Sequence, residues 1–109
     1  MKREFFFFYG TLRGKDKPTY WGEGILRNYE KHNLGLYPGI VRNLGSEVEG
    51  EIHRIPLSDI KNLDRYEGFI SEGNPNNLFN REKVIVKMTE PLYGRIIECL
   101  VYTYGKELS

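Results

Sequence analysis

The sequence of 109 residues contains a single cysteine and no excess of either charge. Cys99 has no partner for an intramolecular disulfide and lies in an apolar segment, so we expect a buried, inert thiol in a reducing compartment. The net charge is +1, and basic and acidic residues are interspersed along the chain. This composition argues against a dedicated nucleic-acid-binding protein, which needs a basic surface to displace counterions.

Long hydrophobic runs are also missing. No stretch approaches the ~20 apolar residues of a membrane-spanning helix. The apolar run that follows Met1-Lys2-Arg3-Glu4 is too short for the core of a signal peptide and ends at Gly10. Because the chain also has no linker, repeat or low-complexity tract, we expect one soluble, cytoplasmic domain over residues 1–109, with no membrane partner.

Aromatic residues, by contrast, are abundant at 14%, and the apolar pattern predicts several strands. Residues 5–9 form a continuous apolar run, which is typical of a central strand covered on both faces. Further extended segments are expected within residues 21–36, 40–41, 47–55, 81–88 and 95–104. The last two segments flank a turn at residues 91–94 and should form a hairpin.

One segment has helical spacing instead. After Pro56, the apolar residues Leu57, Ile60 and Leu63 recur with a helical period, and Gly68 stands where a left-handed helix cap belongs. Many strands and one clear helix predict an α+β domain, with the sheet curled into a small β-barrel.

Glu67 is the candidate catalytic group. It lies seven residues after Ile60 and four after Leu63, on the apolar face of the predicted helix. A charged group there is costly unless it is paired or protonated, and the C-terminal end of a helix disfavours negative charge. Both effects raise the pKa of the carboxyl above its ordinary value, which suits general acid/base catalysis.

Two other interpretations of Glu67 stay open at this point. The helix could fray before Glu67, so that the side chain reaches solvent, or the carboxylate could form a structural ion pair with Arg65 or Arg81. The neighbouring acid, Asp64, is expected to face away from the apolar stripe and to be solvated.

The segment Tyr9-Gly10-Thr11-Leu12 is the candidate binding loop. Consecutive backbone N–H groups at the end of a strand bind carboxylates and other oxyanions, and Gly10 lets a ligand approach the backbone closely. Thr11 adds a hydroxyl, and Arg13 a cation. A plain turn between strand and loop is the alternative.

Two further groups of residues are candidates for parts of a site. Glu49, Glu51 and His53 share one face of a predicted strand and could be imagined as metal ligands, but alternation favours a solvated strand face. Tyr102 and Tyr104 are expected inside the barrel, as core residues or as part of a pocket wall.

Taken together, the motifs resemble the gamma-glutamylcyclotransferase-like family. The two most specific are the apolar strand running into Tyr9-Gly10-Thr11-Leu12 and the segment of residues 63–68, Leu-Asp-Arg-Tyr-Glu-Gly. Weaker matches at residues 37–41, 48–52 and 79–82 follow in the same order, so the resemblance covers nearly the whole chain.

The resemblance implies a small mixed β-barrel and an enzyme that converts a γ-glutamyl amine or amide to 5-oxoproline and the free amine. No cofactor or metal is implied. The catalytic glutamate of the family matches Glu67, and its substrate-binding loop matches Tyr9, Gly10, Thr11 and Leu12. The expected partner is therefore a small γ-glutamyl molecule, with the leaving amine open among amino acids, lysine isopeptides and other γ-glutamyl compounds.

This chain departs from the family pattern in two places. Many relatives have a longer helical stretch after the loop, whereas here only residues 13–20 precede the next extended segment. Many also have Tyr at the position of Phe79, so a hydroxyl contact is lost. A non-catalytic module that binds carboxylates or γ-glutamyl compounds on the same fold remains the alternative function.

Overall fold

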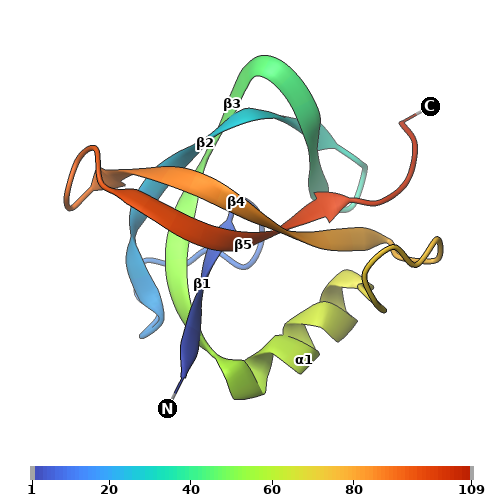
Figure 1. Ribbon diagram of the computed structural model, residues 1–109, viewed down its shortest axis with the longest axis horizontal. Coiled ribbons are helices and arrows are strands. Elements are labelled where there is room, and N and C mark those ends of the chain that lie inside the picture. The colour runs from blue at the N-terminus through green and yellow to red at the C-terminus, as the bar shows by residue number, and fades with distance from the viewer. Residues whose placement is uncertain (1, 109) are drawn as a thin grey trace.

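The computed structural model describes residues 2–108, and within them the chain forms five strands and one helix (Figure 1). In chain order these are β1 (Arg3–Phe8), β2 (Tyr20–Asn33), β3 (Pro38–Pro56), α1 (Leu57–Glu67), β4 (Phe79–Glu90) and β5 (Ile96–Tyr104). This mixed, sheet-dominated architecture with one described helix is the α+β class that the sequence predicted.

The described strands form one sheet in the order β1-β3-β2-β4-β5. Neighbouring strands pair antiparallel, except that β1 pairs parallel with β5 at Phe6 and Leu100 and closes the sheet on itself. The predicted hairpin is formed by β4 and β5, which pair from Phe79 with Tyr104 to Lys87 with Ile96.

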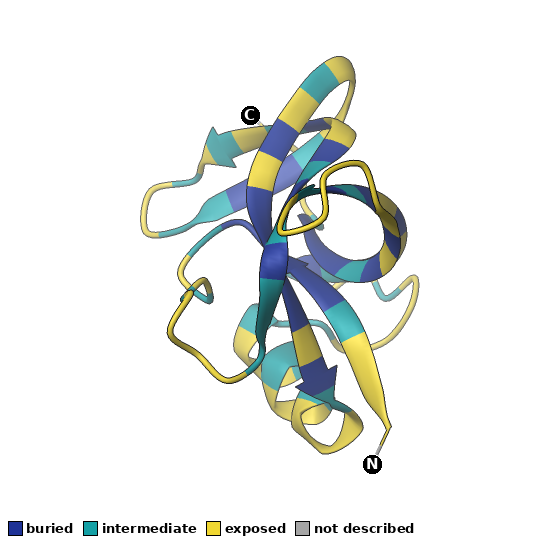
Figure 2. Cartoon of the chain, turned by 90° about the vertical axis from the view of Figure 1, so that its left-hand side faces the viewer, coloured by how far each residue is buried: buried dark blue, intermediate teal, exposed yellow. Residues whose placement is uncertain are grey.

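Strand β1 is covered on both faces, as its unbroken apolar run predicted. Phe7 packs into one cluster of buried residues, whereas Phe6 and Phe8 pack into a second cluster on the other side. The two clusters face opposite sides because successive side chains of a strand alternate between its faces. Exposed residues lie mainly on loops and on α1 (Figure 2), and residues 42–45 in the middle of β3 are exposed as well.

Strand β3 is longer than the sequence suggested. We predicted a turn at residues 37–39 and separate extended pieces at 40–41 and 47–55, but a single strand runs from Pro38 to Pro56. β2 pairs with it from Tyr20 opposite His53 to Asn33 opposite Pro38, with irregularities near Tyr20 and Arg27. The two predicted pieces are thus joined in one strand, but pairing with β2 is interrupted between them. It passes from Arg27 opposite Glu47 to Tyr29 opposite Arg42, so that residues 43–46 have no partner in β2.

Helix α1 begins directly after Pro56 and ends at Glu67, within the predicted span. Gly68 adopts a left-handed conformation with φ of 71°, and the Phe69 N–H donates to the Asp64 carbonyl at 2.8 Å. These features close the helix, and they place Glu67 in its last turn. Among residues 2–108, no helix is long and apolar enough to cross a membrane.

Candidate functional site

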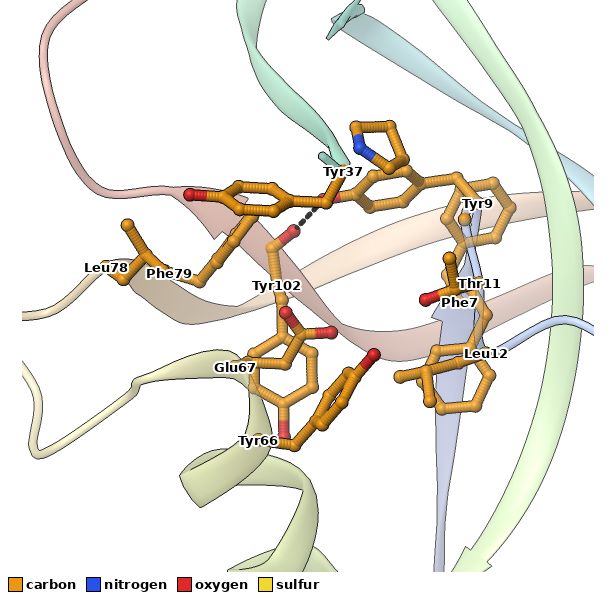
Figure 3. A pocket seen from close by; sticks show the side chains of 13 residues that line it. Phe7, Tyr9, Thr11, Leu12, Tyr37, Tyr66, Glu67, Leu78, Phe79 and Tyr102 are labelled. Carbon is orange, nitrogen blue, oxygen red and sulfur yellow. Dashed lines mark hydrogen bonds between the residues drawn. The ribbon is translucent and has the colours of Figure 1, made fainter. Parts of the chain in front are cut away.

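A cavity of about 270 Å³ lies where the end of β1 meets the end of α1 (Figure 3). Most of its walls are apolar or aromatic. The lining residues are Phe7, Phe8, Tyr9, Gly10, Thr11, Leu12, Tyr37, Pro38, Tyr66, Glu67, Leu78, Phe79 and Tyr102. The structure therefore brings the predicted catalytic residue and all four residues of the predicted binding loop to one cavity.

The loop leaves β1 immediately after Phe8. The Arg13 N–H donates to the Gly10 carbonyl at 3.2 Å and closes a tight turn. Within residues 2–108, the N–H groups of Gly10, Thr11 and Leu12 donate no hydrogen bond to a side chain. Apart from any pairing within the strands, they also donate none to a backbone carbonyl. Three successive backbone donors at the cavity wall can therefore serve an anionic ligand.

Gly10 is required for close packing. A Cβ atom built on Gly10 would lie 2.9 Å from the Cγ of Pro38, which also lines the cavity. The loop and the start of β3 approach one another too closely for a side chain at this position. The glycine thus lets the loop pack against Pro38 and leaves its backbone free of a side chain at the cavity wall.

The segment that follows the binding loop is held against β3 by a buried carboxylate. Glu51 accepts a hydrogen bond from the Gly14 N–H at 2.7 Å, and its carboxylate also lies 3.0 Å from His53 Nε2. The other ring nitrogen of His53, Nδ1, is 2.7 Å from Thr19 Oγ1. Glu51 and His53 therefore hold the middle and the end of the segment between β1 and β2.

This arrangement contradicts the expectation of a solvated face for Glu49, Glu51 and His53. Only Glu49 is exposed; Glu51 is buried, and His53 has no exposed surface. Alternation predicted solvent on this face, but the segment of residues 10–19 folds over it. Among the described residues, no group of three or more His, Cys, Asp or Glu could hold a metal ion.

Glu67 lines the cavity from the last turn of α1. Burial raises the pKa of its carboxyl to about 7, and burial is the only cause of the shift. Neither alternative interpretation of Glu67 holds, because α1 extends through this residue and, among residues 2–108, its carboxyl forms no ion pair with Arg65 or Arg81. Near neutral pH, the carboxyl is therefore able both to accept and to release a proton.

Asp64, three residues earlier, forms the ion pair with Arg81 that one alternative interpretation gave to Glu67. Its carboxylate accepts hydrogen bonds from Arg81 Nη1 at 2.5 Å and from the Tyr102 hydroxyl at 2.7 Å. The guanidinium of Arg81 also lies over the Phe69 ring at 4.9 Å. The expectation that Asp64 is solvated was wrong, because β4 and β5 bring Arg81 and Tyr102 against this side of the helix.

Two tyrosines, Tyr9 and Tyr102, line the cavity. The Tyr9 hydroxyl donates to the Tyr102 carbonyl at 2.6 Å and joins the end of β1 to β5 (Figure 3). Burial raises the pKa of Tyr9, and the Glu67 carboxylate raises it further. Burial and then the hydrogen bond to Asp64 raise the pKa of Tyr102. Both phenols therefore stay protonated and act as donors near neutral pH.

Asn77 positions the wall that Leu78 and Phe79 form, and its role was not predicted from the sequence. Its side chain is 1% exposed and accepts a hydrogen bond from the Ile70 N–H at 2.6 Å. It also donates to the Ser71 carbonyl at 2.8 Å and to Asn80 Oδ1 at 3.1 Å. These bonds fold the segment after Gly68 so that Leu78 and Phe79 reach the cavity. An Asn among several in a polar loop carries no signal that it is buried.

The single cysteine lies outside this site. Cys99 is buried in β5, and burial raises the pKa of its thiol to about 12. The thiol is therefore protonated and unreactive near neutral pH, as the apolar context predicted. Of the two tyrosines expected inside the barrel, Tyr102 lines the cavity, and Tyr104 packs in the second apolar cluster.

Comparison with known proteins gives a consistent result. A family model described as "Gamma-glutamyl cyclotransferase, AIG2-like" matches residues 6–109. The Gamma-glutamylcyclotransferase family protein ytfP of Citrobacter rodentium is 38% identical over 65 residues, which cover 53% of this chain and 56% of that protein. The corresponding Escherichia coli K12 protein is 37% identical over 65 residues and is covered to 57%. The aligned region thus spans about half the length of the curated relatives.

Solved structures share the fold. An AIG2-like protein from Mus musculus superposes with a TM-score of 0.77 at 20% identity, over 99% of this chain and 81% of that chain. A structure described as "Gamma-glutamyl cyclotransferase" has a TM-score of 0.70 at 19% identity, over 94% of this chain and 67% of that one. The family model that matches residues 6–109 shows that the chain belongs to the gamma-glutamyl cyclotransferase, AIG2-like family.

Proposed function

We propose that this protein is an enzyme that cyclises a γ-glutamyl amine or amide to 5-oxoproline and releases the free amine, with Glu67 as the general acid/base. The observation that carries the proposal is the Glu67 carboxyl, which has a pKa of about 7 and shares a cavity with a loop of free backbone N–H groups. Membership of the family supports the general type of reaction.

The proposed reaction is an intramolecular aminolysis. The α-amine nitrogen of the glutamyl group attacks the γ-carbonyl carbon, a new C–N bond closes the five-membered ring, and the C–N bond to the leaving amine breaks. Glu67 accepts the proton from the attacking nitrogen and delivers it to the departing nitrogen. All atoms come from the substrate, so the step requires no oxidant, reductant or other co-reactant.

A carboxyl with a pKa near the working pH suits both halves of this proton transfer. A carboxylate of ordinary pKa would accept the proton poorly, and a permanently protonated group would not accept it at all. General acid/base groups of this kind typically contribute a factor of about 10²–10⁴ in rate. Burial at the cavity wall therefore accounts for the protonation behaviour that the reaction needs.

The loop supplies the other requirement, which is orientation. A free γ-glutamyl chain is extended and flexible, and its α-amine meets the γ-carbonyl rarely. Backbone donors of Gly10, Thr11 and Leu12 would hold the α-carboxylate, and the narrow aromatic cavity would keep the chain folded. Fixing reacting groups in an attack geometry removes much of the entropic part of a barrier.

The direct test is release of 5-oxoproline from a panel of γ-glutamyl amines and dipeptides. The variant Glu67→Gln preserves the shape of the side chain and removes the proton acceptor, and we expect it to lower kcat by about 10²–10⁴. Glu72→Gln is the matched control, because Glu72 is an exposed acid in the following loop. Turnover by Glu67→Gln at the wild-type rate would refute the mechanism.

The same experiment tests the alternative function. Saturable binding of γ-glutamyl compounds by a folded wild-type protein, without 5-oxoproline release from any of them, would favour a non-catalytic binding module. That outcome would contradict the proposed enzyme.

A further inference from the structure

The described walls of the cavity carry no fixed positive charge. The lining residues include the Glu67 carboxyl but no Lys, Arg or His. Basic side chains of neighbouring segments are engaged elsewhere: Arg81 pairs with Asp64, and Lys17 donates to the Leu12 carbonyl at 3.0 Å. Arg13 Nε likewise donates to the Gly10 carbonyl at 3.2 Å. Recognition of an anionic group in the cavity therefore falls to uncharged donors, the backbone N–H groups of the loop and the Thr11 hydroxyl.

The walls on the two sides of Glu67 differ in chemistry (Figure 3). Thr11 and Leu12 of the binding loop lie on one side, whereas Leu78 and Phe79 lie on the other, with Tyr37 above them in this view. The rings of Tyr37 and Phe79 contact one another, with 5.7 Å between their centroids. The loop side thus presents backbone donors beside the rings of Phe7 and Tyr9, whereas the other side presents an aromatic and aliphatic surface without the loop's free N–H groups (Figure 3).

We propose that the leaving amine carries a neutral aromatic group and no carboxylate, with Tyr37, Leu78 and Phe79 forming the subsite for its ring. The inference rests on the proposed function, because the γ-glutamyl α-carboxylate must occupy the loop side for the α-amine to reach Glu67. The substituent on the departing nitrogen then lies on the far side of Glu67, against the aromatic wall.

The size of the cavity agrees with such a substituent. An apolar cavity of about 150 Å³ accommodates one benzene molecule. The volume here is about 270 Å³, which leaves room for a ring beside a folded glutamyl chain. Burying the ring against apolar side chains stabilises the bound substrate, and aromatic pairs add to this gain.

A carboxylate on the leaving amine would be unfavourable for an electrostatic reason. In a γ-glutamyl-α-amino acid, the carboxylate is one carbon away from the nitrogen that Glu67 must protonate. Two carboxylates would then lie within a few ångströms, and no cationic side chain lines the cavity to offset their repulsion. The same repulsion would hinder ionisation of Glu67, which must be a carboxylate to accept the first proton.

Four substrates separate the two features of the leaving group. γ-Glutamyl-phenethylamide and γ-glutamyl-phenylalanine share the ring and differ by one carboxylate. γ-Glutamyl-ethylamide and γ-glutamyl-alanine differ in the same way and lack the ring. For 5-oxoproline release, we expect the ring to raise kcat/KM by about 10–100-fold and the carboxylate to lower it by a similar factor.

A positive charge introduced at this wall tests the location of the subsite. Leu78→Arg adds a cation to the aromatic side, whereas Leu78→Met keeps an apolar side chain of similar volume. Relative to Leu78→Met, we expect Leu78→Arg to raise the kcat/KM ratio of γ-glutamyl-phenylalanine to γ-glutamyl-phenethylamide by about tenfold. A ratio cancels differences in the amount of folded enzyme, and the four-substrate comparison needs no variant.

The outcomes distinguish this inference from the function on which it rests. Release from all four substrates at similar rates, or fastest release from γ-glutamyl-alanine, would overturn the aromatic subsite and leave the cyclotransferase intact. An unchanged ratio in Leu78→Arg would likewise overturn the assignment of the ring to this wall. No release from any γ-glutamyl compound would refute the proposed function, and the inference with it.

Discussion

Asp64 and Glu67 lie three residues apart on one helix, and their carboxyl groups have opposite environments. Asp64 is held between Arg81 and the Tyr102 hydroxyl. Glu67 lines an apolar cavity, and burial alone raises the pKa of its carboxyl to about 7. Because Asp64 engages the cation of β4, Glu67 is left without a counterion and can exchange a proton near neutral pH.

The largest effect on this comparison should come from breaking the ion pair. Asp64→Asn removes the charge that holds Arg81 and Tyr102, and we expect the free energy of unfolding to fall by about 2–4 kcal/mol. Loss of one partner leaves a half-buried guanidinium without its counterion. Chemical denaturation would measure the change, with Asp59→Asn in the first turn of α1 as the matched control. Equal stabilities of the two variants would show that the pair contributes nothing.

The second test concerns the pH dependence of activity. Because the base must be ionised and the pKa of Glu67 is about 7, kcat/KM should fall below that pH. With one titrating group the fall approaches tenfold per pH unit, which is about a hundredfold at pH 5. Initial rates of 5-oxoproline release from pH 4.5 to 8.5 would give the profile. A midpoint near pH 4.5 would mean that Glu67 behaves like a solvated carboxylate and that the contrast with Asp64 is absent.

A third test measures how the raised pKa of Glu67 changes the stability of the folded protein with pH. A carboxyl whose pKa is higher in the folded than in the unfolded protein binds its proton more tightly when folded. The folded state therefore loses stability as pH rises from the unfolded pKa, about 4.3, to the folded value of about 7. Glu67→Gln should accordingly be more stable than wild type by about 1–2 kcal/mol at pH 8 and nearly equal to it at pH 4. Thermal unfolding at both pH values would measure this, and a difference that grows toward low pH would contradict it.

The smallest effect should come from Glu51, a third acid that is paired like Asp64 but lies away from the reacting groups. Glu51→Gln weakens the bonds to the Gly14 N–H and to His53, which tie down the binding loop. A looser loop should raise KM by about 3–10-fold while kcat changes little, because each lost hydrogen bond is worth about 0.5–1.5 kcal/mol. Steady-state kinetics would separate the two constants. A fall in kcat with KM unchanged would assign Glu51 a role in the reaction itself.

Much of this site was predictable where local pattern and local geometry agree. The helical spacing of Ile60 and Leu63 and the cap at Gly68 were enough to place Glu67 in the last turn of α1, near the apolar side. The unbroken run of phenylalanines likewise predicted a strand covered on both faces. Both features depend on residues within one or two turns of chain, over which side-chain periodicity is reliable.

The errors concern polar residues whose partners are distant in the sequence. Asp64 was expected in solvent, yet its partners Arg81 and Tyr102 come from β4 and β5. Glu51 and His53 follow a polar-out alternation, but the segment of residues 10–19 covers them. Asn77 looked like any other loop residue until its three hydrogen bonds were known.

By itself, the sequence determined most of the strands though not the continuity of β3, the single described helix and its end, and the two motifs that meet at the cavity. Each of these follows from short-range periodicity, helix capping and the freedom of glycine. Only the tertiary structure decided which carboxyl is paired and which is left alone. Ion pairing and desolvation depend on distances between segments far apart along the chain, and pairing across the closed sheet sets those distances.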